Sequence, residues 1–276
     1  MKIEVQPPED ESLQSQLISL YLAFKDTEGQ TLFDLSRINW LFPLLILPVA
    51  AYIQDTDSDF ICPGNPDVRS YLETVRFPSG VESVSEMQKE KSYVPLIVLR
   101  KSRFQEREHL RDCFAEMVYR VLEPTVDVRN AVYYPITELV ENIFEHSLAE
   151  KGYLFAQHYP KKGFVDLCIA DRGRGIAASY KKEKGLDFSD REALIESLKG
   201  LSVKQEKGRG YGIRTSRRVI CEGLGGELVM ISGKAALCAS RREILYDLSP
   251  FCWKGVIVAY RIPKPDRPVD IYQFLE

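Results

Sequence analysis

ITELVENIFEHS, residues 136–147, is the stretch that decides the fold of the C-terminal part of this chain. At 100° per residue, Glu138, Asn142 and His146 fall within about 80° of one another on a helix. The apolar face beside this polar stripe consists of Ile136, Leu139, Val140 and Ile143. A carboxylate and an amide on one rigid helix can supply a base and an oxygen ligand for Mg²⁺. Taken alone, the pattern also fits an ordinary amphipathic helix whose Glu138 and Asn142 are solvated.

A second stretch, VDLCIADRGRGI (165–176), is a strand that ends at Asp171 and continues into Gly173 and Gly175. A carboxylate at such a strand end can accept a hydrogen bond from an exocyclic amine such as that of adenine. The glycines let a flat ring approach the backbone. The alternative is a simple turn after the strand. A calcium loop is excluded because its acidic spacing is missing.

The third stretch, EKGRGYGIRTSRRVI (206–220), places Gly208, Gly210 and Gly212 before a helix that starts near Ile213. Backbone amides freed by glycine, together with the positive end of the helix and Arg209, favour a phosphate group. A dinucleotide-binding fingerprint is excluded because Ile213 stands where its third glycine belongs, and the chain contains no GxxxxGK[ST] sequence.

In this order and spacing, the three stretches make the chain similar to the GHKL ATPases. That superfamily includes gyrase B subunits, heat-shock-90 chaperones, mismatch-repair ATPases, sensor histidine kinases and bacterial anti-sigma serine kinases. The resemblance covers roughly residues 95–265. It implies a Bergerat fold, an α/β sandwich in which helices cover one face of a mixed sheet. It also implies ATP and Mg²⁺ as cofactors.

The resemblance implies a role for each matching residue. Asn142 binds Mg²⁺, Glu138 acts as or near the general base, and Asp171 contacts the adenine amine. The expected cofactor-binding residues are Asn142, Asp171, Gly173, Gly175, Ile176, Ser202, Lys204, Gly208, Arg209, Gly210, Tyr211, Gly212 and Ile213. Residues 177–207 become a lid from which Ser202 and Lys204 reach the γ-phosphate. A solvated charged loop is the alternative for this segment.

Two details narrow the resemblance. His146 lies four residues after Asn142, which resembles the anti-sigma serine kinases, and we expect its side chain to pack. In the last strand, WKGVIVAYRIP (253–263), Val256 follows Gly255 where many relatives have a Gly-Thr pair. The hydroxyl that would bind near the adenine-recognising acid is therefore missing.

The N-terminal part alternates short strand-like and helical runs, which predicts a small α/β layer. Residues 31–53 (TLFDLSRINWLFPLLILPVAAYI) resemble the core of a STAS domain, although Ser36 lies too early to match the usual phosphoacceptor serine. The polar stretch 79–92 is the candidate linker. The expected domains are a regulatory unit at 1–92, the nucleotide-binding domain at 93–265 and a tail at 266–276.

Composition limits the partners and the compartment. A net charge of −3 with mixed acids and bases gives no basic surface, so nucleic acid is not an expected partner. The six cysteines form no CxxC pair, which indicates reduced thiols and a cytoplasmic location. The apolar run at 41–53 is shorter than the roughly 20 residues of a spanning helix, so we expect no membrane insertion.

These observations favour an ATP-dependent protein serine kinase or a slow ATPase in bacterial signalling, acting on a protein partner or phosphoacceptor. A module that binds ATP and switches conformation without useful turnover is the main alternative. A histidine autokinase is less favoured, because the upstream His109 lacks the H-E/D-x-x-P arrangement. The absence of a transducer domain and of a basic surface disfavours a topoisomerase fragment.

Overall fold

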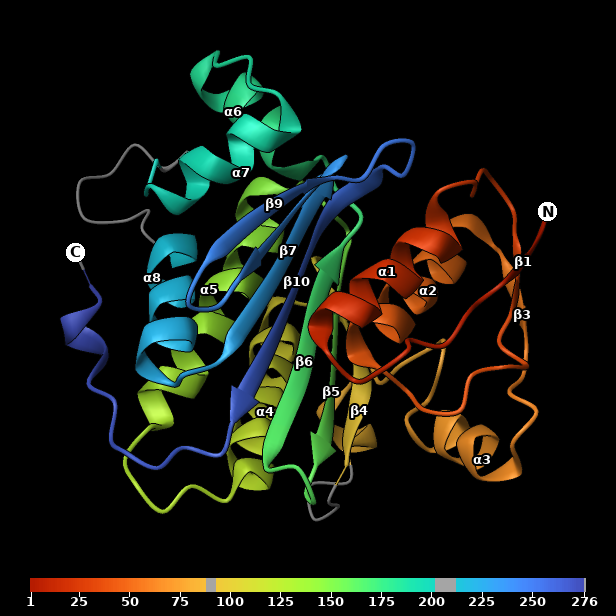
Figure 1. Ribbon diagram of the computed structural model, residues 1–276, viewed down its shortest axis with the longest axis horizontal. Helices are drawn as coiled ribbons and strands as arrows, with labels where there is room; N and C mark the ends of the chain where they lie inside the picture. Colours follow the sequence, from red (N-terminus) through yellow and green to blue (C-terminus); the bar gives the residue numbers. More distant parts are fainter. Residues whose placement is uncertain (88–92, 202–211, 276) are drawn as a thin grey trace.

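The computed structural model describes residues 1–87, 93–201 and 212–275. Within these ranges the chain is an α/β structure with a seven-stranded antiparallel sheet, a small three-stranded parallel sheet and eight α-helices (Figure 1). The small sheet belongs to the N-terminal part of the chain, and the large sheet is built by residues 94–263. The predicted α/β class is confirmed.

The small sheet and its helices form an N-terminal unit, which we define as β1 through α3. Its three strands pair in parallel in the order β1-β2-β3, as successive βαβ connections require. The elements are β1 (Lys2–Glu4), α1 (Leu13–Phe24), β2 (Leu32–Asp34), α2 (Pro43–Thr56), β3 (Asp59–Ile61) and α3 (Pro66–Thr74). The predicted small α/β layer is therefore present.

Helix α2 is the central element of the N-terminal unit. Every residue from Pro43 to Ile53 is buried, because α2 lies between the small sheet and the large sheet (Figure 1). A helix that is apolar all round is stable only when it is covered on all sides. The apolar run in the sequence is thus accounted for by burial. In the described part of the chain, no helix has both the length and the apolar character that crossing a bilayer requires.

The large sheet has the strand order β4-β5-β6-β10-β7-β8-β9. Its strands are β4 (Val94–Arg100), β5 (Lys151–Tyr159), β6 (Phe164–Asp171), β7 (Glu227–Gly233), β8 (Ala235–Ala239), β9 (Glu243–Asp247) and β10 (Trp253–Pro263). All adjacent pairs among these strands are antiparallel. The expectation of a mixed sheet was therefore wrong.

The connections explain the antiparallel pairing. One helix between two strands returns the chain to its starting edge and gives a parallel pair, whereas β4 and β5 are joined by two helices in succession. Strands β6 and β7 do run in the same direction, since both pair antiparallel with β10. They are not neighbours, however, because β10 lies between them. The helix pattern in the sequence indicated the crossovers but not this insertion.

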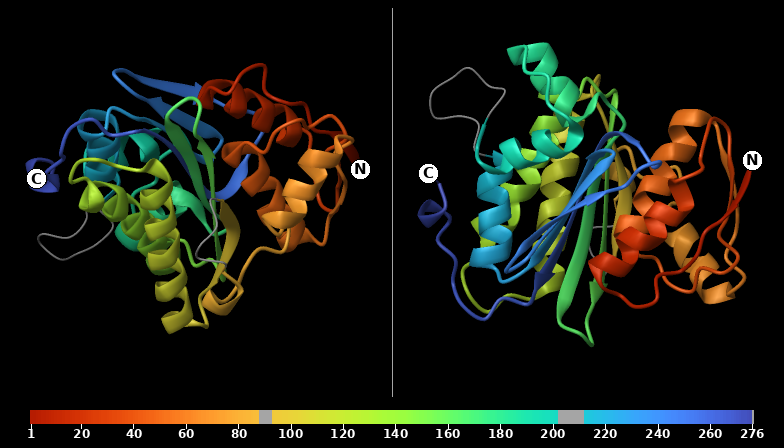
Figure 2. Two further views of the ribbon diagram at one scale, coloured as in Figure 1. Left: turned by 90° about the horizontal axis from the view of Figure 1, so that it is seen from below. Right: turned by 45° about the horizontal axis from the view of Figure 1, so that its top comes forward.

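Both faces of the large sheet are covered. Helices α4 (Phe104–Leu122), α5 (Arg129–His146) and α8 (Gly212–Arg218) pack on one face, and α1 and α2 pack on the other (Figure 2). In β5, Tyr153 and Phe155 belong to the core beneath the N-terminal unit, while Leu154 and Ala156 belong to the core beneath α4 and α5. Burial on both sides is why such strands are apolar at nearly every position.

The segment predicted as a lid, 177–207, is largely helical where it is described. It contains most of α6 (Gly175–Lys184) and all of α7 (Asp190–Leu198), and α7 begins with a capping box between Ser189 and Glu192. Helix α7 and strands β8 and β9 were not predicted from the sequence. The Gly233-Lys234 pair between β7 and β8 is a two-residue hairpin connection and was the available signal.

Candidate functional site

A cavity opens between α5, the sheet strands β6 and β10, and the α6–α7 pair, and it encloses about 880 Å³ including its open mouth. That figure includes open solvent at the mouth, and the space that the centre of a water molecule can reach is about 100 Å³. The sequence-predicted residues that line it are Glu138, Asn142, Asp171, Gly175, Ile176 and Ile213. Residues from all three sequence stretches therefore meet in one cavity.

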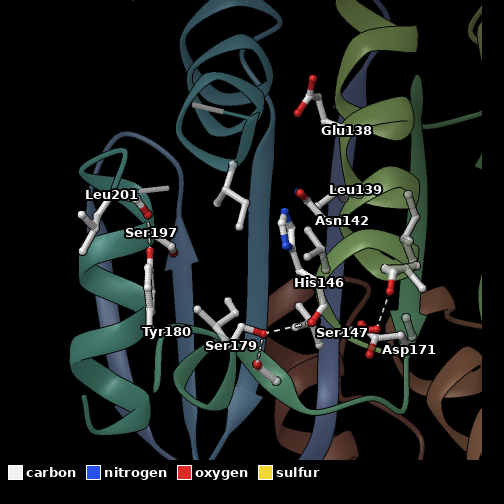
Figure 3. Close-up of a pocket in the computed structure, with 18 residues that line it drawn as sticks. Glu138, Leu139, Asn142, His146, Ser147, Asp171, Ser179, Tyr180, Ser197 and Leu201 are labelled. Atoms are coloured by element: carbon white, nitrogen blue, oxygen red, sulfur yellow. Dashed lines mark hydrogen bonds between the residues drawn. The ribbon is translucent and has the colours of Figure 1, made fainter. Parts of the chain in front are cut away.

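Helix α5 carries the polar stripe that faces this cavity. Glu138, Asn142 and His146 project from it into the cavity, with Glu138 next to the start of α8 (Figure 3). The adjacent face, which includes Ile136 and Val140, is buried against the sheet. Packing of that apolar face fixes the rotation of the helix, so that the stripe is held at the cavity wall. The amphipathic pattern of residues 136–147 is confirmed.

Asp171 ends β6 at the far side of the cavity from Glu138 (Figure 3). Its side chain is almost fully buried, and this burial raises its pKa to about 6. The backbone N–H of Gly173 donates a hydrogen bond to the Asp171 Oδ1 atom at 2.8 Å and opposes the rise. At neutral pH the carboxyl group is therefore mostly ionised and is held as a hydrogen-bond acceptor.

Two further hydrogen-bond donors lie next to the Asp171 carboxylate. The side chain of Ser147 and the backbone N–H of Val256 both form hydrogen bonds that lower the pKa of Asp171. Gly255 has a φ of +113° at a bulge of β10, and a Cβ atom there would collide with the backbone of Asp171. Only glycine lets β10 approach the acid so closely. Ser147 was not predicted, although it directly follows His146 in the first stretch.

Glycine is also required next to Glu138. Gly212 is the first residue of α8, and a Cβ atom at this position would overlap the Oε2 atom of Glu138. The start of α8 therefore lies directly against the predicted base. Tyr134, one turn before Glu138 on α5, has a pKa raised to about 12, mainly by burial and then by the charge of Glu138.

Some predicted residues cannot be placed. Ser202, Lys204, Gly208, Arg209, Gly210 and Tyr211 lie outside the described residues. Gly173 is described but does not line the cavity; its N–H binds Asp171, and a Cβ atom there would collide with the Ser147 carbonyl oxygen. Its role is to shape the turn after β6.

The wall opposite α5 comes from the segment predicted as a lid, although its lining residues were not named from the sequence. Tyr180 and Leu201 line it, and the Tyr180 hydroxyl donates a hydrogen bond to the carbonyl oxygen of Leu201. Arg174 Nε donates to the carbonyl oxygen of His146 at 2.6 Å, and the guanidinium also pairs with Glu183 of α6. The Arg174 side chain therefore joins the end of α5 to α6. The imidazole of His146 lines the cavity, with Nδ1 3.6 Å from Glu183 Oε2.

The metal ligands available here are oxygen atoms. Within the described ranges, no group of three or more histidine, cysteine, aspartate or glutamate side chains is arranged to hold a metal ion. The amide of Asn142 and the carboxylate of Glu138 line the same wall of the cavity. Oxygen ligands suit Mg²⁺, which commonly takes one or two protein oxygens and completes its shell with water and phosphate. The donor set therefore fits Mg²⁺ bound together with a phosphate group.

No protein-family model matches this chain, and no curated protein matches its sequence.

Proposed function

We propose that this chain is a Mg-ATP-binding protein of the GHKL type that transfers the γ-phosphate to a protein hydroxyl or hydrolyses ATP slowly. The observation that carries the proposal is the convergence of three separate sequence stretches, through Glu138, Asp171 and Ile213, on one cavity. Independent solvated surfaces have no reason to meet in this way. Under this proposal the sheet and α4, α5 and α8 form a Bergerat fold.

The two ends of the cavity suit the two ends of ATP. At one end, the buried Asp171 carboxylate accepts a hydrogen bond from the exocyclic amine of adenine. The apolar side chains of Ile169 and Val258 cover the ring. At the other end, Glu138 lies against Gly212 at the start of α8, and Asn142 lines the same wall of the cavity. ATP has a purine amine at one end and a charged phosphate chain at the other. These two ends match the two ends of the cavity.

Asn142 would hold Mg²⁺ through its amide oxygen. When Mg²⁺ is bound, it would neutralise part of the phosphate charge. Glu138 then takes the proton from the attacking hydroxyl or water, because its carboxylate lies one helical turn from Asn142 on the same wall. Gly212 keeps that carboxylate close to the start of α8.

Calorimetry with Mg-ADP and with a non-hydrolysable ATP analogue tests the binding part. We expect Asn142→Ala to abolish Mg-dependent binding and Asp171→Ala to abolish adenine nucleotide binding. Asn130→Ala is the matched control, since Asn130 is exposed near the start of the same helix and does not line the cavity. Unchanged affinity in both site variants would overturn the proposal.

Phosphate release and phosphotransfer by Glu138→Gln test the catalytic part. A general base commonly contributes 10²–10⁴-fold, so we expect turnover to fall about 100-fold or more while nucleotide affinity stays within about threefold. Glu141→Gln, on the same helix but outside the cavity lining, should keep full turnover. A protein that binds ATP but shows no Glu138-dependent turnover would instead be a nucleotide-responsive switch.

A further inference from the structure

Arg172 directly follows the adenine-recognising acid but points away from the cavity, toward the N-terminal unit. Its Nε donates a hydrogen bond to Asp55 Oδ2 of α2 at 2.8 Å. The guanidinium lies 4.7 Å from the ring centroid of Tyr52, also on α2, and 4.8 Å from that of Trp253. Only 12% of the side chain is exposed. A planar cation held between two rings and paired at its edge has little freedom.

We call the contacts of Arg172 with Asp55, Tyr52 and Trp253 the clamp. Trp253 also contacts the end of β6 at Asp171. Its indole Nε1 donates a hydrogen bond to the backbone oxygen of Asp171 at 2.9 Å, and its side chain is 2% exposed. Phe24 of α1 packs edge-on against the indole, with ring centroids 5.6 Å apart. Phe24 also contacts Tyr52 in the same manner. Helices α1 and α2, which lie beside the large sheet in Figure 1, therefore contact the two side chains that hold the end of β6.

We propose that the N-terminal unit sets the nucleotide affinity of the cavity through Arg172, with Asp55 and Tyr52 as positioning residues for Asp171. This inference rests on the proposed function. The Asp171 carboxylate must be aimed at the adenine amine, and its aim depends on the backbone between residues 171 and 173. That backbone is held by Trp253 at the Asp171 carbonyl and by α2 at the Arg172 side chain. A partner that displaces α2 from Arg172 would release this constraint.

The position of the clamp indicates which part of the nucleotide it affects. The clamp acts on the end of β6, whereas Asn142 and Glu138 lie on α5, whose apolar face packs on the sheet and whose end contacts β6 only near Ser147. Loosening the clamp should therefore reduce recognition of the base and leave the phosphate contacts intact. Because binding linkage is reciprocal, bound adenine nucleotide should in turn favour the docked N-terminal unit.

The experiment measures Mg-ATP-analogue and Mg-GTP-analogue affinities for Asp55→Ala, Arg172→Met and the double variant, using the full chain. Arg172→Met should weaken ATP binding about tenfold, which lies within the usual range of coupling between sites. Asp55→Ala should weaken it about threefold, and the double variant should match Arg172→Met because both remove one interaction. The preference for ATP over GTP should fall in the same proportion.

The matched control is Glu4→Ala, which breaks the 2.9 Å ion pair with Arg37 in the same N-terminal unit without touching Arg172. It should keep the wild-type affinity and base preference. Asp55 is partly exposed, so its alanine variant should fold even if Arg172→Met does not. Folded variants with unchanged ATP affinity, or with an equal loss for both nucleotides, would overturn the inference alone. A wild-type chain that binds neither nucleotide would overturn the proposed function first, and the inference with it.

Discussion

Replacing Asp171 with asparagine should stabilise the folded protein at neutral pH while it weakens adenine nucleotide binding. Burial raises the pKa of Asp171 from 3.8 to about 6, so the folded state binds this proton more tightly than the unfolded state. Stability therefore falls as the pH rises between about 4 and 6 and stays lower above pH 6. A shift of about two pKa units corresponds to about 3 kcal/mol of cost for the buried anion at pH 8.

Asparagine removes the charge but keeps one acceptor oxygen for the N–H of Gly173. Its amide NH₂ group faces the backbone N–H of Val256. Two donors cannot form a hydrogen bond with each other, and this loss costs about 1 kcal/mol. The variant should therefore be more stable than the wild type by about 2 kcal/mol at pH 8. At pH 4 this advantage should be lost, because the wild-type carboxyl group is then protonated.

Urea unfolding of both proteins from pH 4 to pH 8 measures this difference directly. Other titrating groups contribute equally to both proteins, so the difference in unfolding free energy isolates Asp171. We expect that difference to change by about 2.5 kcal/mol across the range, because the unfolded carboxyl group is already partly ionised at pH 4. A difference that is independent of pH would refute the argument that Asp171 is kept as a buried anion for recognition.

Three further changes test other parts of the structure. Gly212→Ala forces a Cβ atom onto the Glu138 carboxylate, so we expect ATP turnover to fall at least about tenfold with nucleotide binding largely kept; wild-type turnover in a phosphate-release assay would contradict this. Asp166→Ala removes the bidentate partner of the mostly buried Arg261 guanidinium, and urea unfolding should show a loss of about 3–5 kcal/mol. Leu45→Ala opens a cavity at the fully buried first turn of α2 and should cost about 2–5 kcal/mol by the same measurement, whereas Ile18→Ala on the exposed side of α1 should change stability by less than about 0.5 kcal/mol.

The local elements of the site could be predicted because their signals lie within a few residues. The stripe on α5 and the end of β6 at Asp171 agree with the sequence pattern. The start of α8 was placed within one residue, at Gly212. Helix α7 was missed, although the Ser189–Glu192 capping box marks its first turn. The helix was not recognised because the segment is rich in charged residues and was interpreted as a loop.

The contacts that make these elements a site depend on residues far apart in the chain. Gly255 reaches Asp171 only because β10 inserts between β6 and β7, and no local pattern encodes that order. Ser147 likewise reaches Asp171 only through the packing of α5 on the sheet. The position of Arg172 between Tyr52 and Trp253 was equally unforeseen.

The sequence by itself determined the helix that carries Glu138 and Asn142, the strand that ends at Asp171, and the apolar character of the helix at 43–56. Periodicity reports which side of a helix or strand is apolar, because that property is set by the residues themselves. It does not report which other apolar surface will cover that side. The tertiary structure decided the antiparallel strand order, the cavity and the packing of the N-terminal unit behind Asp171, because these depend on the packing of the whole chain.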